Sequence, residues 1–187
     1  MILKRTSILL VVAAASIVAL SAWATLQRGP VGNLAVPRSA KAVDLSRYAG
    51  LWYEIGRYEN GFERGCEAVT AEYALRDDGL IGVLNTCRQG GVDGPVKTAE
   101  GRAKVVDDSG DAKLKVSFFG PFFVGDYWVL DHAGDYSWSI VGEPSGRYLW
   151  LLSRTANPSE AVRATIMNRT GALGYDLALV RETRHRP

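Results

Sequence analysis

The sequence predicts an all-β fold, because the chain after residue 44 consists mainly of short alternating segments separated by turn residues. Two of the turns are clear hairpin signals, Arg76-Asp77-Asp78-Gly79 and Asp107-Asp108-Ser109-Gly110. In addition, only one segment, near the end of the chain, has the periodicity of a helix. Strands and turns at this spacing favour an antiparallel barrel or sandwich.

Eight strands are expected, in the order of the chain. They cover residues 51–58, 68–75, 80–87, 99–106, 113–119, 125–130, 136–141 and 148–153. The segment 113–119 shows its orientation most clearly, because its apolar residues alternate with lysines, which require water. The residues that therefore face inward are Leu114, Val116 and Phe118.

One amphipathic helix follows the eighth strand. Asn157 is a suitable N-cap, Pro158 suits the first helical position, and Glu160 adds a charge that favours the first turn. Gly171 is the expected C-cap. The apolar residues, which share a single face, are Val162, Ile166 and Met167. A helix with one apolar face is expected to pack on the outside of the sheet, and a short ninth strand is expected at 175–180.

The N-terminus has the order of a secretory signal, with Lys4 and Arg5, an apolar run at 8–20, and Ala22-Trp23-Ala24. Residues 1–24 are therefore expected to be either a signal peptide or an N-terminal anchor, and both predict export. No cysteine directly follows the apolar run, so the usual bacterial lipid attachment is not expected. Residues 25–43 are expected to form a linker, 44–182 the folded domain, and 183–187 a charged tail.

Cys66 and Cys87 are the two cysteines of the chain. In an exported domain an even number of cysteines favours a disulfide. The alternative is a pair of buried free thiols, which behave as small apolar groups.

Charge and motif content argue against several classes of function. The 22 basic and 20 acidic residues are spread along the chain, so nucleic acid is not an expected partner. The two histidines, His132 and His185, form no cluster with metal-ligand spacing, and no Gly-x-Ser-x-Gly elbow is present. We therefore expect no bound metal, no cofactor and no enzymatic activity. A hydrolase acting on lipids remains the alternative.

Three short motifs resemble those of the lipocalins. Gly50-Leu51-Trp52 resembles the Gly-x-Trp that opens the first strand, the segment 131–136 resembles the second motif, and Ser153-Arg154-Thr155 resembles the third. Four blocks, at 52–55, 62–65, 115–121 and 148–155, are similar to the Blc-type bacterial lipocalins and the temperature-induced lipocalins of plants. The resemblance implies an eight-stranded antiparallel up-and-down β-barrel with one C-terminal α-helix and a short ninth strand.

The resemblance also implies which residues do what. Trp52, Gly50 and Arg154 are expected to be structural, with the Arg154 guanidinium over the indole at the closed end of the barrel. An inward Trp52 sets the orientation of the first strand. The residues then expected to line a lipid cavity are Glu54, Gly56, Tyr58, Ala71, Tyr73, Ile81, Val83, Asn85, Leu114, Val116, Phe118, Tyr127, Val129, Tyr148 and Trp150.

Glu54 is the one acidic residue in this set, and two interpretations are open. An ionised carboxylate inside a barrel is costly without a partner, so it is expected either to pair with an inward Arg or Tyr hydroxyl or to be protonated. The paired or protonated group would then serve as a polar anchor for a ligand, or as an internal structural hydrogen bond.

Function follows from the same resemblance. It implies a protein of the periplasm or outer membrane that binds a fatty acid or lysophospholipid, and that stores or transports it for membrane maintenance under stress. Phe122 and Phe123 are candidates for contact with a membrane surface or a second subunit, and a homodimer remains open. The alternatives are a carrier of a tetrapyrrole or another hydrophobic ligand, and a barrel filled by its own side chains.

Overall fold

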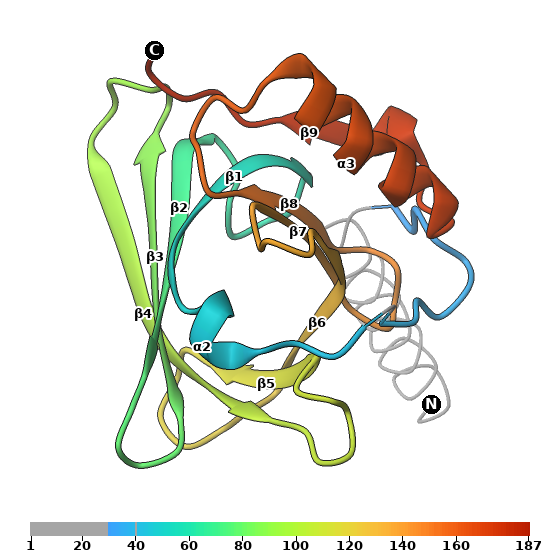
Figure 1. The fold of residues 1–187 in the computed structure, drawn as a ribbon. Helices are drawn as coiled ribbons and strands as arrows, with labels where there is room; N and C mark the ends of the chain where they lie inside the picture. The colour runs from blue at the N-terminus through green and yellow to red at the C-terminus, as the bar shows by residue number, and fades with distance from the viewer. Residues whose placement is uncertain (1–29, 40) are drawn as a thin grey trace, which may run out of the picture.

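The computed structural model describes residues 30–39 and 41–187, and the expected signal or anchor segment lies outside them. It shows an eight-stranded antiparallel up-and-down barrel with one long helix on its outer surface (Figure 1). This confirms the expected fold class. The strands are β1 Gly50–Tyr58, β2 Cys66–Leu75, β3 Ile81–Gln89, β4 Val96–Val105, β5 Lys113–Ser117, β6 Gly125–His132, β7 Trp138–Gly142, β8 Leu149–Ser153 and the short β9 Val180–Glu182.

Strand β1 closes the barrel. Its first part pairs with β2, in the register Gly50↔Tyr73 to Tyr53↔Thr70, and its later part pairs with β8. At its end, β1 pairs with β9, from Gly56↔Glu182 to Tyr58↔Val180. The ninth strand therefore continues the sheet where β2 has left β1.

A short helix, α2 (Leu45–Tyr48), lies across one end of the barrel (Figure 1). The Asp44 carboxylate caps it by accepting hydrogen bonds from the backbone N–H groups of Ser46 and Arg47. The backbone N–H of Asp44 donates to the Tyr136 hydroxyl at 2.7 Å, which fixes the helix to the β6–β7 loop. We call this the closed end. The opposite end, which carries the loops 59–65, 90–95, 118–124 and 143–148, is the open end.

The long helix, α3 (Glu160–Ala172), begins and ends later than expected. Its N-cap is Ser159, whose hydroxyl accepts from Val162 N–H, whereas the Asn157 amide donates to the carbonyl of Arg186. Gly174 has the left-handed φ of +90° that ends a helix, while Gly171 is still helical. Residues 177–179 form a 3-10 turn, so the ninth strand starts at Val180 and not at 175.

Two apolar clusters lie on the two faces of the sheet, because alternate residues of a strand point in opposite directions. One fills the closed half of the barrel interior and includes Trp52, Leu114 and Leu152. The other lies on the outer face beneath α3 and includes Leu151 and Ile166. In the part of the chain that the structure describes, no helix has the length and apolar character needed to span a bilayer.

Both segments that flank the barrel contact it. The described part of the expected linker runs along the outside, where Gly32 N–H donates to Gly146 O and Val43 N–H donates to Gly110 O. In the expected tail, Arg184 N–H donates to the Glu67 carboxylate at 2.8 Å, and a His185 ring nitrogen lies 2.7 Å from Glu54 O. The tail is tied to the barrel because it continues past β9 between β1 and β2.

The expected disulfide is confirmed. Cys66 at the start of β2 and Cys87 near the end of β3 are bonded, with Cα atoms 5.5 Å apart. The bond lies near the open end, where β2 has separated from β1, and it covalently links two neighbouring strands there.

Candidate functional site

The interior-facing residues are buried at the closed end, and toward the open end their accessibility differs between strands. Trp52 on β1 and Leu114 on β5 are almost fully buried at the closed end. Toward the open end, Arg57 on β1 is also fully buried, whereas Asn85 on β3 is partly buried and Ala99, its partner on β4, is exposed. The barrel is therefore a cup with a packed floor and a partly accessible upper part.

Most of the predicted cavity residues share the interior face. They are Glu54, Ala71, Tyr73, Ile81, Val83, Asn85, Leu114, Val116, Phe118, Tyr127, Val129, Tyr148 and Trp150. Within this set Ile81, Leu114 and Val129 belong to the packed floor, so they support the cup without being accessible to a ligand.

Gly56 and Tyr58 face outward, which corrects the prediction for them. The register between β1 and β8 shifts between Glu54 and Gly56, so the alternation changes by one residue at Ile55. Gly56 lies against β9, and the Tyr58 hydroxyl donates to Asp176 O at 2.8 Å on the outer surface. Arg57 takes the interior position instead, opposite Trp150.

The shift brings Glu54 and Arg57 together inside the barrel. Both side chains are at most 2% exposed, and Arg57 Nη1 donates to Glu54 Oε1 at 2.8 Å. The hydroxyl of Thr183, from the C-terminal segment, donates to the same oxygen. Burial and the negative charge of Glu63 raise the pKa of Glu54 to about 8, against the opposing effect of Arg57 and Thr183. Glu54 thus has the arginine partner that the sequence left open, and its accepted bonds are internal.

A network of tyrosine hydroxyls lies between the floor and the open half. Tyr73 donates to Tyr127 at 2.9 Å, and the Tyr48 hydroxyl lies 3.0 Å from both Tyr127 and Ser139. Burial raises the pKa of Tyr48 to about 12. These hydroxyls are therefore neutral, and they satisfy one another where α2 meets the interior.

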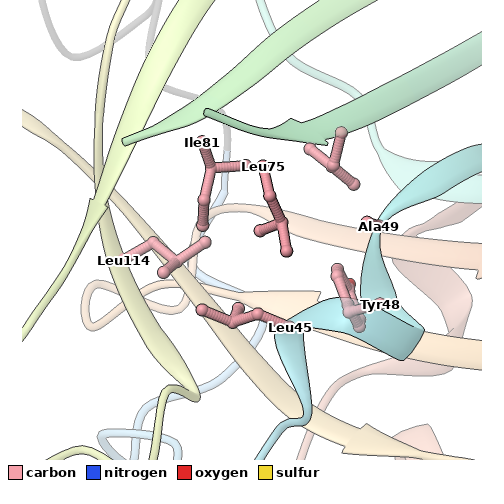
Figure 2. Close-up of a pocket in the computed structure, with 7 residues that line it drawn as sticks. Leu45, Tyr48, Ala49, Leu75, Ile81 and Leu114 are labelled. Atoms are coloured by element: carbon pink, nitrogen blue, oxygen red, sulfur yellow. The ribbon is translucent and has the colours of Figure 1, made fainter. Parts of the chain in front are cut away.

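Beneath this network, a cavity of about 10 Å³ lies beside α2 (Figure 2). Its lining is almost wholly apolar: Leu45, Tyr48, Ala49, Tyr73, Leu75, Ile81 and Leu114. That volume is close to the minimum for one water molecule. A cavity of this size cannot hold an organic ligand. The candidate site is therefore the set of accessible interior residues toward the open end.

Three aromatic rings and a carboxylate line one side of the mouth. The rings of Phe62, Tyr148 and Trp150 lie with centroids 5.7 to 6.4 Å apart and with planes tilted by 10 to 32°. Glu63, in the same loop as Phe62, accepts a hydrogen bond from Trp150 Nε1–H at 2.9 Å and another from the Asn60 amide. We call these four residues the mouth cluster: Phe62, Glu63, Tyr148 and Trp150.

Sequence reasoning identified Tyr148 and Trp150 but did not assign a role to Arg57, Phe62 or Glu63. Phe62 and Glu63 lie in one of the four resemblance blocks, and this was a usable signal. Arg57 had no such signal, because strict alternation from Trp52 places it outside.

The loop between β5 and β6 carries further aromatic residues at the open end. Phe119 and Phe122 are 84% and 69% exposed, whereas Phe123 is half-buried with Lys104 Nζ 5.1 Å from its ring centroid. Of the two residues expected to make external contacts, only Phe122 is therefore largely accessible.

At the closed end, Arg154 lies over Trp52 with its guanidinium carbon 3.8 Å from the ring centroid. Its other partners are backbone carbonyls, including Leu51 O at 2.7 Å and Ala49 O at 2.9 Å. These contacts join β8, β1 and the end of α2. Every partner is part of the scaffold, which is the geometry of a structural residue.

A barrel closed at one end, with an apolar and aromatic upper interior and few polar groups, has the features of a binding protein for a small hydrophobic molecule. No group of His, Cys, Asp or Glu side chains suited to a metal occurs among residues 30–39 and 41–187.

Comparison with known proteins agrees with this class. The model of the lipocalin-like domain matches residues 43–185. The chain is 43% identical to the outer membrane lipoprotein Blc of Vibrio cholerae, over 78% of this chain and 86% of that protein. It is 38% identical to temperature-induced lipocalin-1 of Arabidopsis thaliana, over 76% and 80% respectively. Cockroach allergen Per a 4 has a similar structure, with a TM-score of 0.64 at 18% identity over 83% of this chain and 96% of that one.

The chain therefore belongs to the lipocalin family. Members of this family characteristically bind small hydrophobic molecules and are not typically enzymes. Several of the relatives are named outer membrane lipoprotein Blc.

Proposed function

We propose that this protein binds a single-chain lipid, a fatty acid or a lysophospholipid, in the open half of the barrel. The observation that carries the proposal is the graded interior. Its closed half is packed, and its open half combines the buried pair Glu54 and Arg57 with accessible apolar and aromatic residues, with Asn85 and the mouth cluster as its accessible polar part. Such a site suits a molecule with one long tail and one polar end.

The affinity would come mainly from the tail. Burying an acyl chain contributes about 0.8 kcal/mol per methylene, so a partly inserted tail is held without any specific contact. A small residue gives it room, because Ala99 faces the interior of the open half and is exposed. The interior wall also includes Val116, Tyr127 and Trp150, which are partly buried.

The proposed role is storage or transport of this lipid in the cell envelope, for membrane maintenance under stress. Two observations support this role. The relatives include outer membrane lipoproteins. In addition, Phe119 and Phe122 are exposed in a loop at the open end, from which a lipid would leave. The proposed location is the periplasm or the outer membrane. The lipid would be delivered to a membrane surface. The alternative partner for Phe119 and Phe122 is a second copy of the chain in a homodimer.

The test is native mass spectrometry of the protein purified from its own host, followed by lipid extraction. We expect a copurified fatty acid or lysophospholipid in about one copy per barrel. Reloading the stripped protein with an acyl lipid should restore the mass shift. A barrel that never carries acyl lipid, and cannot be loaded with one, would contradict the proposal and favour an interior filled by its own side chains.

The same preparation tests the two remaining alternatives. A coloured protein would indicate a tetrapyrrole or another pigment, although His132, which makes two backbone contacts near the closed end, does not line the open half. Release of fatty acid from a bound lysophospholipid, at a rate that scales with protein concentration, would indicate a hydrolase.

A further inference from the structure

We infer that the mouth cluster is a recognition site for a cationic ammonium group, and hence that the preferred lipid has a zwitterionic head. The inference rests on the proposed function, because it concerns the polar end of the same ligand. Three observations support it: the position of the Glu63 carboxylate at the mouth, the absence of an ion pair to this carboxylate within the described residues, and the aromatic rings beside it.

Glu63 is held in place by hydrogen bonds and not by a direct ion pair among the described residues. Trp150 Nε1–H and the Asn60 amide both donate to Oε2, which leaves Oε1 without a hydrogen bond among the described residues. No arginine, lysine or histidine in residues 30–39 or 41–187 forms an ion pair with this carboxylate. A half-buried carboxylate that is oriented but unpaired has the capacity to accept a charged donor.

Arg57 is the buried cation beside this loop. Its Nη2 donates to the backbone carbonyl of Glu63 at 3.0 Å and its charge also acts on the Glu63 carboxylate, but its direct side-chain partners are Glu54 at 2.8 Å and Glu59 at 3.2 Å. The negative potential of Glu63 extends into the interior, because it contributes to the raised pKa of Glu54. An added positive charge at the mouth would therefore be favourable, and an added negative charge there would be unfavourable.

The aromatic rings beside Glu63 provide a second favourable interaction for an ammonium group. Phe62, Tyr148 and Trp150 form an aromatic wall next to the carboxylate, with neighbouring centroids 5.7 and 5.8 Å apart. Aromatic faces attract ammonium ions, and quaternary ammonium groups are recognised by aromatic residues of this kind. Because Phe62 is 58% exposed, the wall remains accessible from solvent. A carboxylate beside an aromatic wall suits a choline or ethanolamine head better than a carboxylate or glycerol head.

The experiment compares four ligands that share one acyl chain: lysophosphatidylcholine, lysophosphatidylethanolamine, lysophosphatidylglycerol and the free fatty acid. Affinities are measured by displacement of a fluorescent fatty acid from the full folded chain. We expect the two ammonium lipids to bind about tenfold more tightly than lysophosphatidylglycerol. In Glu63→Gln this preference should largely disappear, while affinity for the fatty acid is retained or rises.

Two matched variants keep the test specific. Glu100→Gln removes the same charge from the outer face of β4, where Glu100 is exposed, and should leave the preference unchanged. Phe62→Leu keeps an apolar side chain but removes an aromatic face, and should reduce the preference about threefold. Thermal unfolding of each variant shows whether the barrel is intact.

The possible results distinguish failure of the ammonium site from failure of lipid binding itself. Equal affinities for the choline and glycerol lipids in the wild type, or a preference that survives in a folded Glu63→Gln, would overturn the ammonium site and leave lipid binding standing. No displacement by any of the four ligands would overturn the proposed function itself.

Discussion

Trp52 and Trp150 both point into the barrel, but they belong to opposite ends and have different surroundings. Trp52 is completely buried, with Arg154 over its ring and its Nε1–H donated to Tyr48 O at 2.8 Å. Trp150 is partly accessible and donates to Glu63, a side chain of the mouth. Tryptophan is thus a structural residue at the closed end and a residue that lines the accessible interior at the open end. The difference teaches that interior orientation alone does not identify a binding residue; accessibility and the nature of the partner decide it.

The largest expected effect is on the closed end. Trp52→Ala should lower the free energy of unfolding by about 3–5 kcal/mol, because it empties a fully packed site and leaves Arg154 without its ring. Trp150→Ala should cost less stability but weaken acyl-lipid binding about tenfold or more. Urea unfolding and ligand displacement on both variants check the contrast. Equal losses of stability, with lipid affinity unchanged in both, would break the comparison.

Removal of the disulfide, which lies near the open end, should have the next largest effect on stability. Replacing Cys66 and Cys87 together by alanine should lower the free energy of unfolding by about 3 kcal/mol, as expected for a closed loop of this length. Because the bond lies near the mouth, hydrogen exchange should increase first in β2 and β3 close to residues 66 and 87, and not around α2. Uniform loss of protection at both ends would show that the two halves do not differ in local stability.

Filling the open half should affect binding and leave stability almost unchanged. Ala99→Phe places a ring inside the accessible part of the cup, and should weaken acyl-lipid binding about tenfold while changing stability by about 0.5 kcal/mol or less. Thr98→Phe is the matched control, because the neighbouring residue of β4 points outward. If both variants bind lipid like the wild type, the ligand does not occupy the space beside Ala99.

The most gradual expected effect is a pH dependence set by Glu54. Its pKa is raised from the ordinary 4.5 to about 8, so the folded protein binds this proton more tightly than the unfolded chain does. The resulting stability is fully present below the unfolded pKa and is lost as the pH rises through the folded pKa. The melting temperature of the wild type should therefore fall between about pH 4.5 and about pH 8 more than that of Glu54→Gln, whose neutral amide mimics the protonated group. Parallel curves for the two proteins would contradict this assignment.

Sequence reasoning was most successful where the pattern is local and repeated. Turn signals and alternation predicted the strands and the orientation of residues 113–119. The resemblance to the lipocalins supplied the closure of the barrel and the orientation of the other strands. The disulfide followed from the predicted export and the number of cysteines.

The orientation predicted for the end of β1 was wrong, because one residue shifts the register of this strand. The shift at Ile55 exchanges the faces of Arg57 and Tyr58, and nothing in strict alternation signals it. The mouth cluster was also missed, because its members come from the 59–65 loop and from β8 and meet only after the barrel has closed. The cap at Ser159 was missed for a different reason: Asn157 has the right chemistry but bonds to the C-terminal segment.

The packing of the last residues against β1 and β2 also concerns the order of synthesis. Thr183 completes the pair of Glu54 and Arg57, and Arg184 binds the Glu67 carboxylate. Both contacts span most of the domain, because Glu54 and Thr183 are 129 residues apart in the sequence and Glu67 and Arg184 are 117 apart. The two buried carboxylates therefore acquire their full set of partners only after the segment beyond β9 has been synthesised. A nascent chain that lacks this segment keeps an open seam between β1 and β2.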